Sequence, residues 1–189
     1  YPSFPAVAGR QVILGYRAKM SVSRVHWLAR KAIASWKHRM EIIVWNMMER
    51  RYGDLFQSPD DFLAGSTQAY RYVQNELCTA ENVRHLREAC SESVYDAIQE
   101  SSSELEQWRR ENGDKAGMIF DDVQSYFDTI ALPENFNSEG NVTASVAFYA
   151  LVRQQSDPET VLHRIDGFSF QTEWDPVDGL GEWKIVGIW

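Results

Sequence analysis

The sequence predicts an α+β domain in which helices come first and pack on a curved antiparallel sheet, preceded by a long basic helix. Apolar residues recur at three- and four-residue steps as far as residue 113 and alternate with polar residues afterwards, which is typical of helices followed by strands. Three strands joined by short turns close the chain, and such strands favour an antiparallel meander. The 189 residues fit one ordinary domain with an extension, or two very small domains.

The first predicted element is one long helix over residues 21–51. No Gly or Pro interrupts it, and its length would be about 45 Å at the rise of an α-helix. Gly53 is a plausible end point. Apolar residues recur along one of its faces: Val25, Leu28 or Ala29, Ala32, Trp36, Met40, Ile43 and Met47.

The following helices are indicated by capping signals. Ser58 offers a capping hydroxyl, Pro59 suits the first turn, and two carboxylates follow where a helix N-terminus favours them. Thr79 would cap a third helix. Ser91 or Ser93 would begin a fourth, or continue the third, as far as Trp108, before a stop at 112–113.

After Gly113 the apolar spacing changes to two, which predicts strands. We expect strands within 117–132 and over 141–155, 160–174 and 183–189. The intervening segments are rich in Pro, Gly, Asp and Asn, which favour turns. The chain therefore ends in hairpin-linked strands that pack against the preceding helices.

The net charge of −8 hides a strong asymmetry along the chain. Residues 1–51 carry ten Lys or Arg and two Glu, a net charge of +8, whereas residues 52–189 carry nine bases and 25 acids, a net charge of −16. A basic arm on an acidic body suggests that the arm meets an anionic partner. The acidic body argues against a protein embedded in nucleic acid, because phosphate binding favours a basic surface.

Several function classes lack their sequence signature. Cys78 and Cys90 are too few for a disulfide framework or a four-thiolate metal site. No apolar run reaches the roughly 18–20 residues of a membrane-spanning helix, and no phosphate-binding loop, nucleophile elbow or zinc-protease motif occurs. We therefore expect no cofactor and no metal.

A pocket between helices and sheet would be the natural place for acid–base catalysis. Its candidates have no common spacing: His85, His163, Asp121, Asp122, Asp166, Tyr70 and Tyr95. In a strand, His163 and Asp166 would point to opposite faces, which weakens them as a catalytic pair. We therefore expect a protein without catalytic activity.

Two segments resemble the C-terminal domain of the Tim forty-four family, over roughly residues 55–189. They are the helical run Phe62-Leu63, Ala69-Tyr70, Val73, Leu77 with Leu86–Tyr95, and the closing strands with Phe168–Phe170 and Trp183–Val186. The resemblance implies the cone-shaped nuclear-transport-factor-two-like fold for residues 54–189. Residues 1–53 would then be an N-terminal extension with a long basic amphipathic helix.

The same resemblance implies a mitochondrial compartment. We expect a non-catalytic accessory subunit docked on the matrix side of an inner-membrane complex, peripheral and without a transmembrane helix, with a respiratory or ATP synthase assembly favoured. A membrane-facing subunit of the mitochondrial ribosome is the second hypothesis, and a protein-import motor adaptor belongs with it, although the family's chaperone-recruiting region is absent here. An enzyme or ligand carrier that uses the cone pocket is the alternative from another class.

The basic helix is the predicted attachment element. Its tryptophans lie nine residues apart, so successive rings should point in opposite directions. One interpretation is a solvated helix with one face packed on its own domain. The other is a helix that docks on a larger assembly or on anionic lipid headgroups. The predicted docking residues are Arg24, Trp27, Lys31, Trp36, Arg39, Ile43 and Met47.

Overall fold

A computed structural model describes residues 22–79, 83–100, 106–107, 110, 118–155 and 157–189. Its helices are α2 (Arg24–Tyr52), α3 (Pro59–Thr79), α4 (Leu86–Ala89) and α5 (Glu92–Glu100), with 3₁₀ turns η1 (Gly53–Leu55) and η2 (Val83–His85). The strands are β1 (Met118–Ala131), β2 (Gly140–Gln154), β3 (Asp157–Asp175), β4 (Gly179–Leu180) and β5 (Lys184–Ile188). The α+β class, with helices before the sheet, is confirmed.

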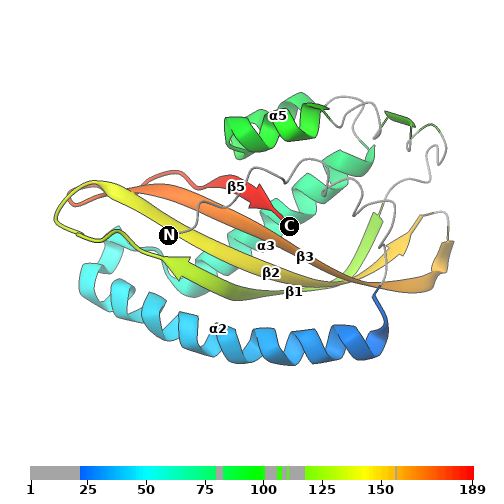
Figure 1. Cartoon of the computed structure of the whole chain (residues 1–189), viewed down its shortest axis with the longest axis horizontal. Helices are drawn as coiled ribbons and strands as arrows, with labels where there is room; N and C mark the ends of the chain where they lie inside the picture. Colours follow the sequence, from blue (N-terminus) through cyan, green and yellow to red (C-terminus); the bar gives the residue numbers. More distant parts are fainter. Residues whose placement is uncertain (1–21, 80–82, 101–105, 108–109, 111–117, 156) are drawn as a thin grey trace.

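The sheet is a curled antiparallel half-barrel (Figure 1). Its order is β1-β2-β3-β4, and β5 also pairs with β3. The predicted meander is therefore confirmed, although β1 carries two register shifts, after Phe120 and after Phe127. Such bulges add local twist and bend a strand.

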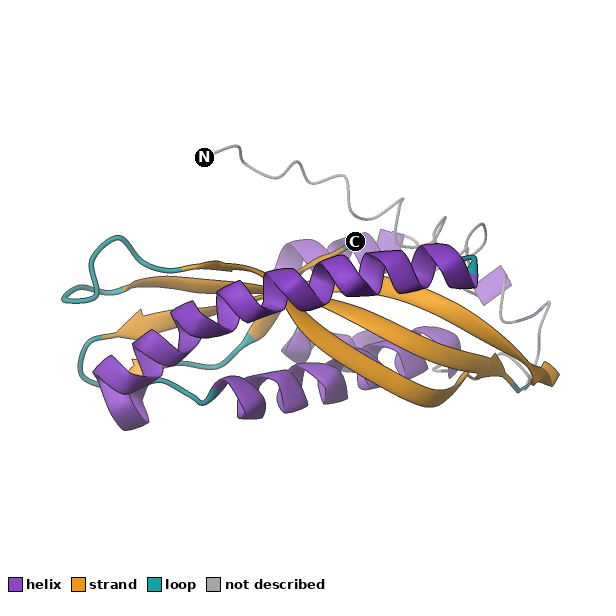
Figure 2. Cartoon of the chain, turned by 90° about the horizontal axis from the view of Figure 1, so that it is seen from below, coloured by secondary structure: helices purple, strands orange, loops and turns teal. Residues whose placement is uncertain are grey.

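The two faces of the sheet are covered by different helices. Phe148 of β2 stacks on Tyr70 of α3, with ring centroids 4.4 Å apart. Its neighbour Tyr149 meets Trp27 of α2 on the other side, at 6.0 Å, because successive strand residues point to opposite faces. Helix α2 crosses the sheet obliquely on this outer face (Figure 2).

The main core lies between the inner face of the sheet and helices α3 to α5. Even-numbered residues of β2 and β3 supply its sheet side, from Val142 to Val152 and from Phe168 to Trp174. Tyr70, Val73, Leu77, Leu86 and Ile98 supply much of its helical side.

Local signals explain the helix ends near the core. Gly53 ends α2 with a φ of 56° and donates its N–H to the Glu49 carbonyl, a left-handed conformation that favours glycine. Ser58 accepts a 3.1 Å hydrogen bond from the Asp61 N–H and so caps α3. Both predicted boundaries are confirmed. The predicted continuation of the fourth helix to Trp108 falls largely on residues 101–105 and 108–109, outside the described residues.

The division of the chain at residue 53 stays a prediction. Helix α2, on the N-terminal side of that boundary, nevertheless contributes fully buried Trp45 to the main core. The long helix is thus fixed to the sheet domain along its length.

Candidate functional site: the exposed face of helix α2

The start of α2 is fixed to β3 at His163 and Arg164, which pair with β2 on one side and lie outside the segment that pairs with β5. The Val22 N–H donates to the His163 carbonyl at 2.9 Å, and the Trp27 indole N–H donates to the Arg164 carbonyl at 3.2 Å. The Trp27 ring also meets the His163 ring edge-on, with centroids 5.3 Å apart. These two hydrogen bonds give partners to the His163 and Arg164 carbonyls of β3, which lie outside the segment of β3 that pairs with β5.

The middle of α2 covers the outer edge of β1 with polar side chains. His38 Nδ1 accepts a 3.3 Å hydrogen bond from the Phe127 N–H, and its ring stacks on the Phe127 ring. Lys37 forms a 2.8 Å ion pair with Asp128. An edge strand left open would expose a row of backbone donors and acceptors, so these contacts close the sheet on this side.

The end of α2 enters the core through Trp45. Its ring lies within 4.7–5.2 Å of the rings of Phe56, Phe62 and Phe127, measured between centroids. Its indole N–H donates to the Gln57 carbonyl at 2.7 Å. With both ends and the middle of the helix fixed, the direction of its outer face is also fixed.

Burial lowers the pKa of His38, and the charge of Asp60 partly opposes this shift. Burial raises the pKa of Glu41, while the Ile130 backbone N–H lowers it and Asp128 raises it. A lowered histidine pKa means that the folded state favours neutral His38, the form in which Nδ1 accepts the Phe127 N–H.

We therefore expect the chain to lose stability as the pH falls from the ordinary histidine pKa of 6.5 towards the lower folded-state value. Above that pH window the contribution of His38 to stability is fully present, because His38 is neutral in both the folded and the unfolded chain. His38→Gln keeps an acceptor without titrating, so it should flatten this slope in urea unfolding measured between about pH 5 and 7.5. Glu41→Gln is the control for the neighbouring acid, and an unchanged slope in His38→Gln would contradict the assignment.

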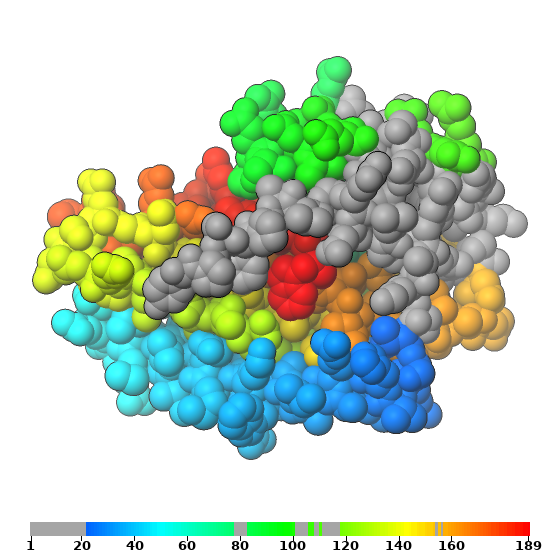
Figure 3. Space-filling view, viewed as in Figure 1, coloured from blue at the N-terminus to red at the C-terminus, as the bar shows by residue number. Residues whose placement is uncertain are grey.

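The outer face of α2 carries large apolar side chains that no described residue covers. Trp36 is 66% exposed, Ile43 54% and Met47 61%. We call this set the exposed apolar stripe; it comprises Val25, Leu28, Ile33, Trp36, Met40, Ile43, Val44 and Met47. The helix occupies one side of the molecule along its whole length (Figure 3), so the stripe faces away from the domain.

The seven predicted docking residues separate into two groups. Trp36, Ile43, Met47, Arg24 and Arg39 are exposed on α2. Trp27 is only 6% exposed, because it packs on the sheet, and its face cannot meet a partner. Lys31 is half-buried over the Trp27 ring, with its ammonium 4.6 Å from the ring centroid.

The nine-residue spacing of the tryptophans accounts for this separation. Nine residues rotate a helix by two and a half turns, so Trp27 and Trp45 point inwards while Trp36 points outwards. The predicted opposition of successive tryptophans is confirmed. The predicted docking set does not include Ile33, which belongs to the exposed apolar stripe, or Arg50 and Arg51, which are exposed at its C-terminal end.

The proposed pocket residues lie on both faces of the sheet. His163 packs on Trp27 outside, whereas Asp166 lies inside, where its carboxylate accepts bonds from Tyr70 at 2.5 Å and Arg164 at 2.8 Å. The prediction that His163 and Asp166 point to opposite faces is confirmed. The spacing of two predicts that Arg164 and Asp166 share one face, which is confirmed, but it does not signal that they form an ion pair.

The other candidates are dispersed. Asp121 pairs with Arg153 at 2.5 Å, and Asp122 accepts a 2.9 Å hydrogen bond from Gln124. His85 is exposed in η2. Tyr95 accepts a hydrogen bond from Gln99 at 2.8 Å. None of these contacts joins two of the candidate groups in a catalytic pair.

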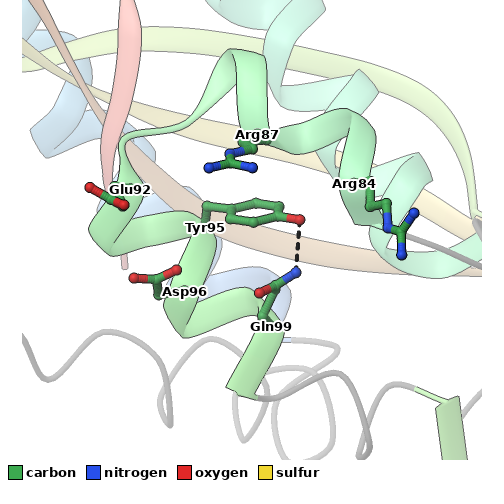
Figure 4. Close-up of a pocket in the computed structure, with 6 residues that line it drawn as sticks. All are labelled: Arg84, Arg87, Glu92, Tyr95, Asp96 and Gln99. Carbon is green, nitrogen blue, oxygen red and sulfur yellow. Dashed lines mark hydrogen bonds between the residues drawn. The ribbon is translucent and has the colours of Figure 1, made fainter.

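Tyr95 lines an open polar hollow of about 420 Å³ between η2 and α5 (Figure 4). Arg87 lies over its ring, with the guanidinium 5.9 Å from the ring centroid. Arg84, Glu92, Asp96 and Gln99 complete the lining. Positive and negative groups are mixed there, so the hollow favours no single ligand charge.

The thiols offer no reactive site in the described part of the chain. Cys90 is buried, and burial raises the pKa of its thiol to about 12, so it stays protonated at neutral pH. The side chain of Cys78 lies outside the described residues. Within the described ranges, no three His, Cys, Asp or Glu side chains gather as metal ligands would.

None of the described helices has the length and apolarity needed to cross a membrane. No protein-family model matches the chain, and no curated protein matches it.

Proposed function

We propose that this protein is a non-catalytic accessory subunit that uses the outer face of α2 to dock on a larger membrane-associated complex. The observation that carries the proposal is the exposed apolar stripe on a helix whose other face is fixed to the sheet. Monomeric proteins rarely expose large contiguous apolar patches unless a partner covers them. Trp36, 66% exposed at the middle of the helix, is the type of residue that dominates interface energetics.

The proposed compartment is the matrix side of the mitochondrial inner membrane. It rests on the resemblance of residues 55–189 to the Tim forty-four family, with its cone-shaped nuclear-transport-factor-two-like fold. The curled sheet preceded by helices is consistent with a cone. A respiratory or ATP synthase assembly is our preferred complex, because the acidic body, net −16 over residues 52–189, suits ribosomal RNA poorly.

A mitochondrial ribosome subunit is the second candidate, and one observation favours it. All the exposed charged residues of α2 are Arg or Lys, and a basic helix alone can hold RNA phosphates. Ribosomal RNA that co-purifies with the chain would support this candidate over a purely protein complex.

The absence of turnover is part of the proposal. Asp166, whose side chain is 18% exposed, is paired with Arg164 and Tyr70 on the inner side of the sheet, an arrangement that suits a structural role. The remaining candidates lie on separate elements and on both faces of the sheet.

Assembly should respond differently to apolar and to charged substitutions on α2. Trp36→Ala with Ile43→Ala should reduce the assembled fraction at every salt concentration, because apolar burial does not depend on charge screening. Arg24→Glu, Arg39→Glu and Arg50→Glu together should reduce it mainly at low salt, since screening acts over about 10 Å at 0.1 M. Lys31 is left unchanged because it packs on Trp27.

The measurement is native gel electrophoresis or sedimentation after mild detergent extraction, across a salt series, with the co-migrating subunits identified. Val177→Ala is the matched control, because Val177 is an exposed apolar residue outside α2, in the β3–β4 turn. If the wild-type chain migrates alone, or if neither α2 variant changes the assembled fraction, the proposed function is wrong.

A further inference from the structure

Part of the exposed apolar stripe of α2, together with Ala29 and Ala32, has the spacing of a helix–helix seam, and Leu28, Ile33 and Val44 of the stripe lie beside it. Apolar residues follow one another at steps of four and three from Val25 through Ala29, Ala32, Trp36, Met40 and Ile43 to Met47. These residues span about 33 Å along the helix. Around the helix axis they occupy a sector about as wide as the contact of one helix on another. Ala29 and Ala32 are small and exposed, so they leave room for a partner's side chains on the turns that precede Trp36.

Both margins of the stripe are basic. At 100° per residue, Arg24 and Arg39 fall on one side and Arg30 and Arg51 on the other, and all four are exposed. Lys37 also falls on the second side but is ion-paired with Asp128, and exposed Arg50 is in line with the stripe, just beyond Met47. The two acids of the helix, Glu41 and Glu49, are half-buried. Their positions fall on the side of the helix that faces the sheet, so no acid interrupts the basic margins. A complementary partner therefore carries acidic residues on both sides of an apolar strip.

We propose that the occupant of this face is an amphipathic α-helix of another protein, with an apolar stripe flanked by Asp and Glu. The inference rests on the proposed docking function and names the partner's chemistry. A second copy of α2 would bring basic margins against basic margins, which costs binding energy. An extended anionic bilayer would bring many more negative charges near a body of net charge −16 than the acidic flanks of one helix do, so the bilayer is the less favourable occupant.

Site-specific photocrosslinking tests the inference on the full chain in cells of its source. A benzophenone amino acid replaces Met40 or Ile43, both 54% exposed, and in control chains it replaces Val161 or Val177 on the sheet side. Mass spectrometry then identifies the attached segment. Both α2 positions should attach to the same segment of one partner, with helical apolar spacing and acidic flanks, and the controls should not.

Charge reversal sharpens the test. Arg39→Glu with Arg50→Glu should reduce the yield of this adduct about tenfold, because two attractive contacts, one at the margin and one at the end of the stripe, become repulsive. An adduct with lipid, with residues 1–21, with another copy, or with a segment lacking acidic flanks would overturn the inference. So would a chain that assembles yet gives no adduct at either position. In each of these cases native gels show separately whether the complex forms, so the inference can fail while the proposed function stands.

Discussion

Trp45→Ala should destabilise the protein by about 3–5 kcal/mol, the range for removal of a large buried aromatic side chain. Trp45 is 0% exposed and contacts aromatic rings from η1's end, α3, β1 and the segment before β5. The substitution leaves a cavity among these rings and an unpaired carbonyl at Gln57. In a chain of this size the melting temperature should fall by roughly 6–20 °C.

Trp36→Ala is the matched control, with the same residue change on the same helix. Because Trp36 is 66% exposed, its removal should change the free energy of unfolding by no more than about 0.5 kcal/mol. Urea unfolding of the two variants beside the wild type measures the difference. Equal effects would show that α2 does not sit on the sheet as described here.

The burial of Trp45 also affects what is expected of the predicted domain boundary at residue 53. Removal of residues 1–53 deletes Trp45 together with Trp27 and the His38 contact at the edge of β1. The shortened chain should therefore be less stable than the whole chain, even where residues 54–189 keep most of the core. The boundary separates sequence segments of opposite charge more clearly than it separates structural units.

Local chemistry made much of the fold predictable. Ser58, Pro59 and Gly53 act within a few residues of themselves, so their capping and turn preferences identify the helix ends. Alternating apolar residues over 141–174 predict strands for the same reason, because β2 and β3 bury one face each. The bulges of β1 depend on contacts with β2 and α2, and no local pattern in 118–131 signals them.

The packed face of α2 was harder to predict because the helix carries two stripes. Val25, Trp36 and Ile43 recur at helical steps on the exposed side, while Trp27, Ala34 and Trp45 recur on the buried side. The buried stripe is interrupted by Lys31, His38 and Glu41, so it looks less apolar than the exposed one. These polar side chains pack on Trp27 or satisfy the edge of β1, a tertiary role that spacing alone does not reveal.

The second large effect is expected at the ion pair inside the core. Arg164 and Asp166 are joined at 2.8 Å, and their side chains are 8% and 18% exposed. Asp166→Leu removes the carboxylate and leaves the Arg164 guanidinium largely desolvated. Loss of one partner of such a pair typically costs about 3–5 kcal/mol. The Tyr70 hydroxyl, which donates to Asp166 at 2.5 Å, loses that acceptor as well.

Two further variants separate the charge from the packing. Arg164→Met with Asp166→Leu removes both charges at similar volume, and such replacements are often neutral, so the double variant should recover most of the stability that Asp166→Leu loses. Asp121→Leu removes the acid of a more exposed pair with Arg153 and should cost no more than about 1 kcal/mol. Urea unfolding of the three variants measures these differences. If Asp166→Leu and Asp121→Leu have equal effects, the Arg164–Asp166 pair is not desolvated. If the double variant is the least stable of the three, the pair stabilises the protein through the attraction between its two charges. The cost of leaving the Arg164 charge desolvated would then not explain the effect of Asp166→Leu.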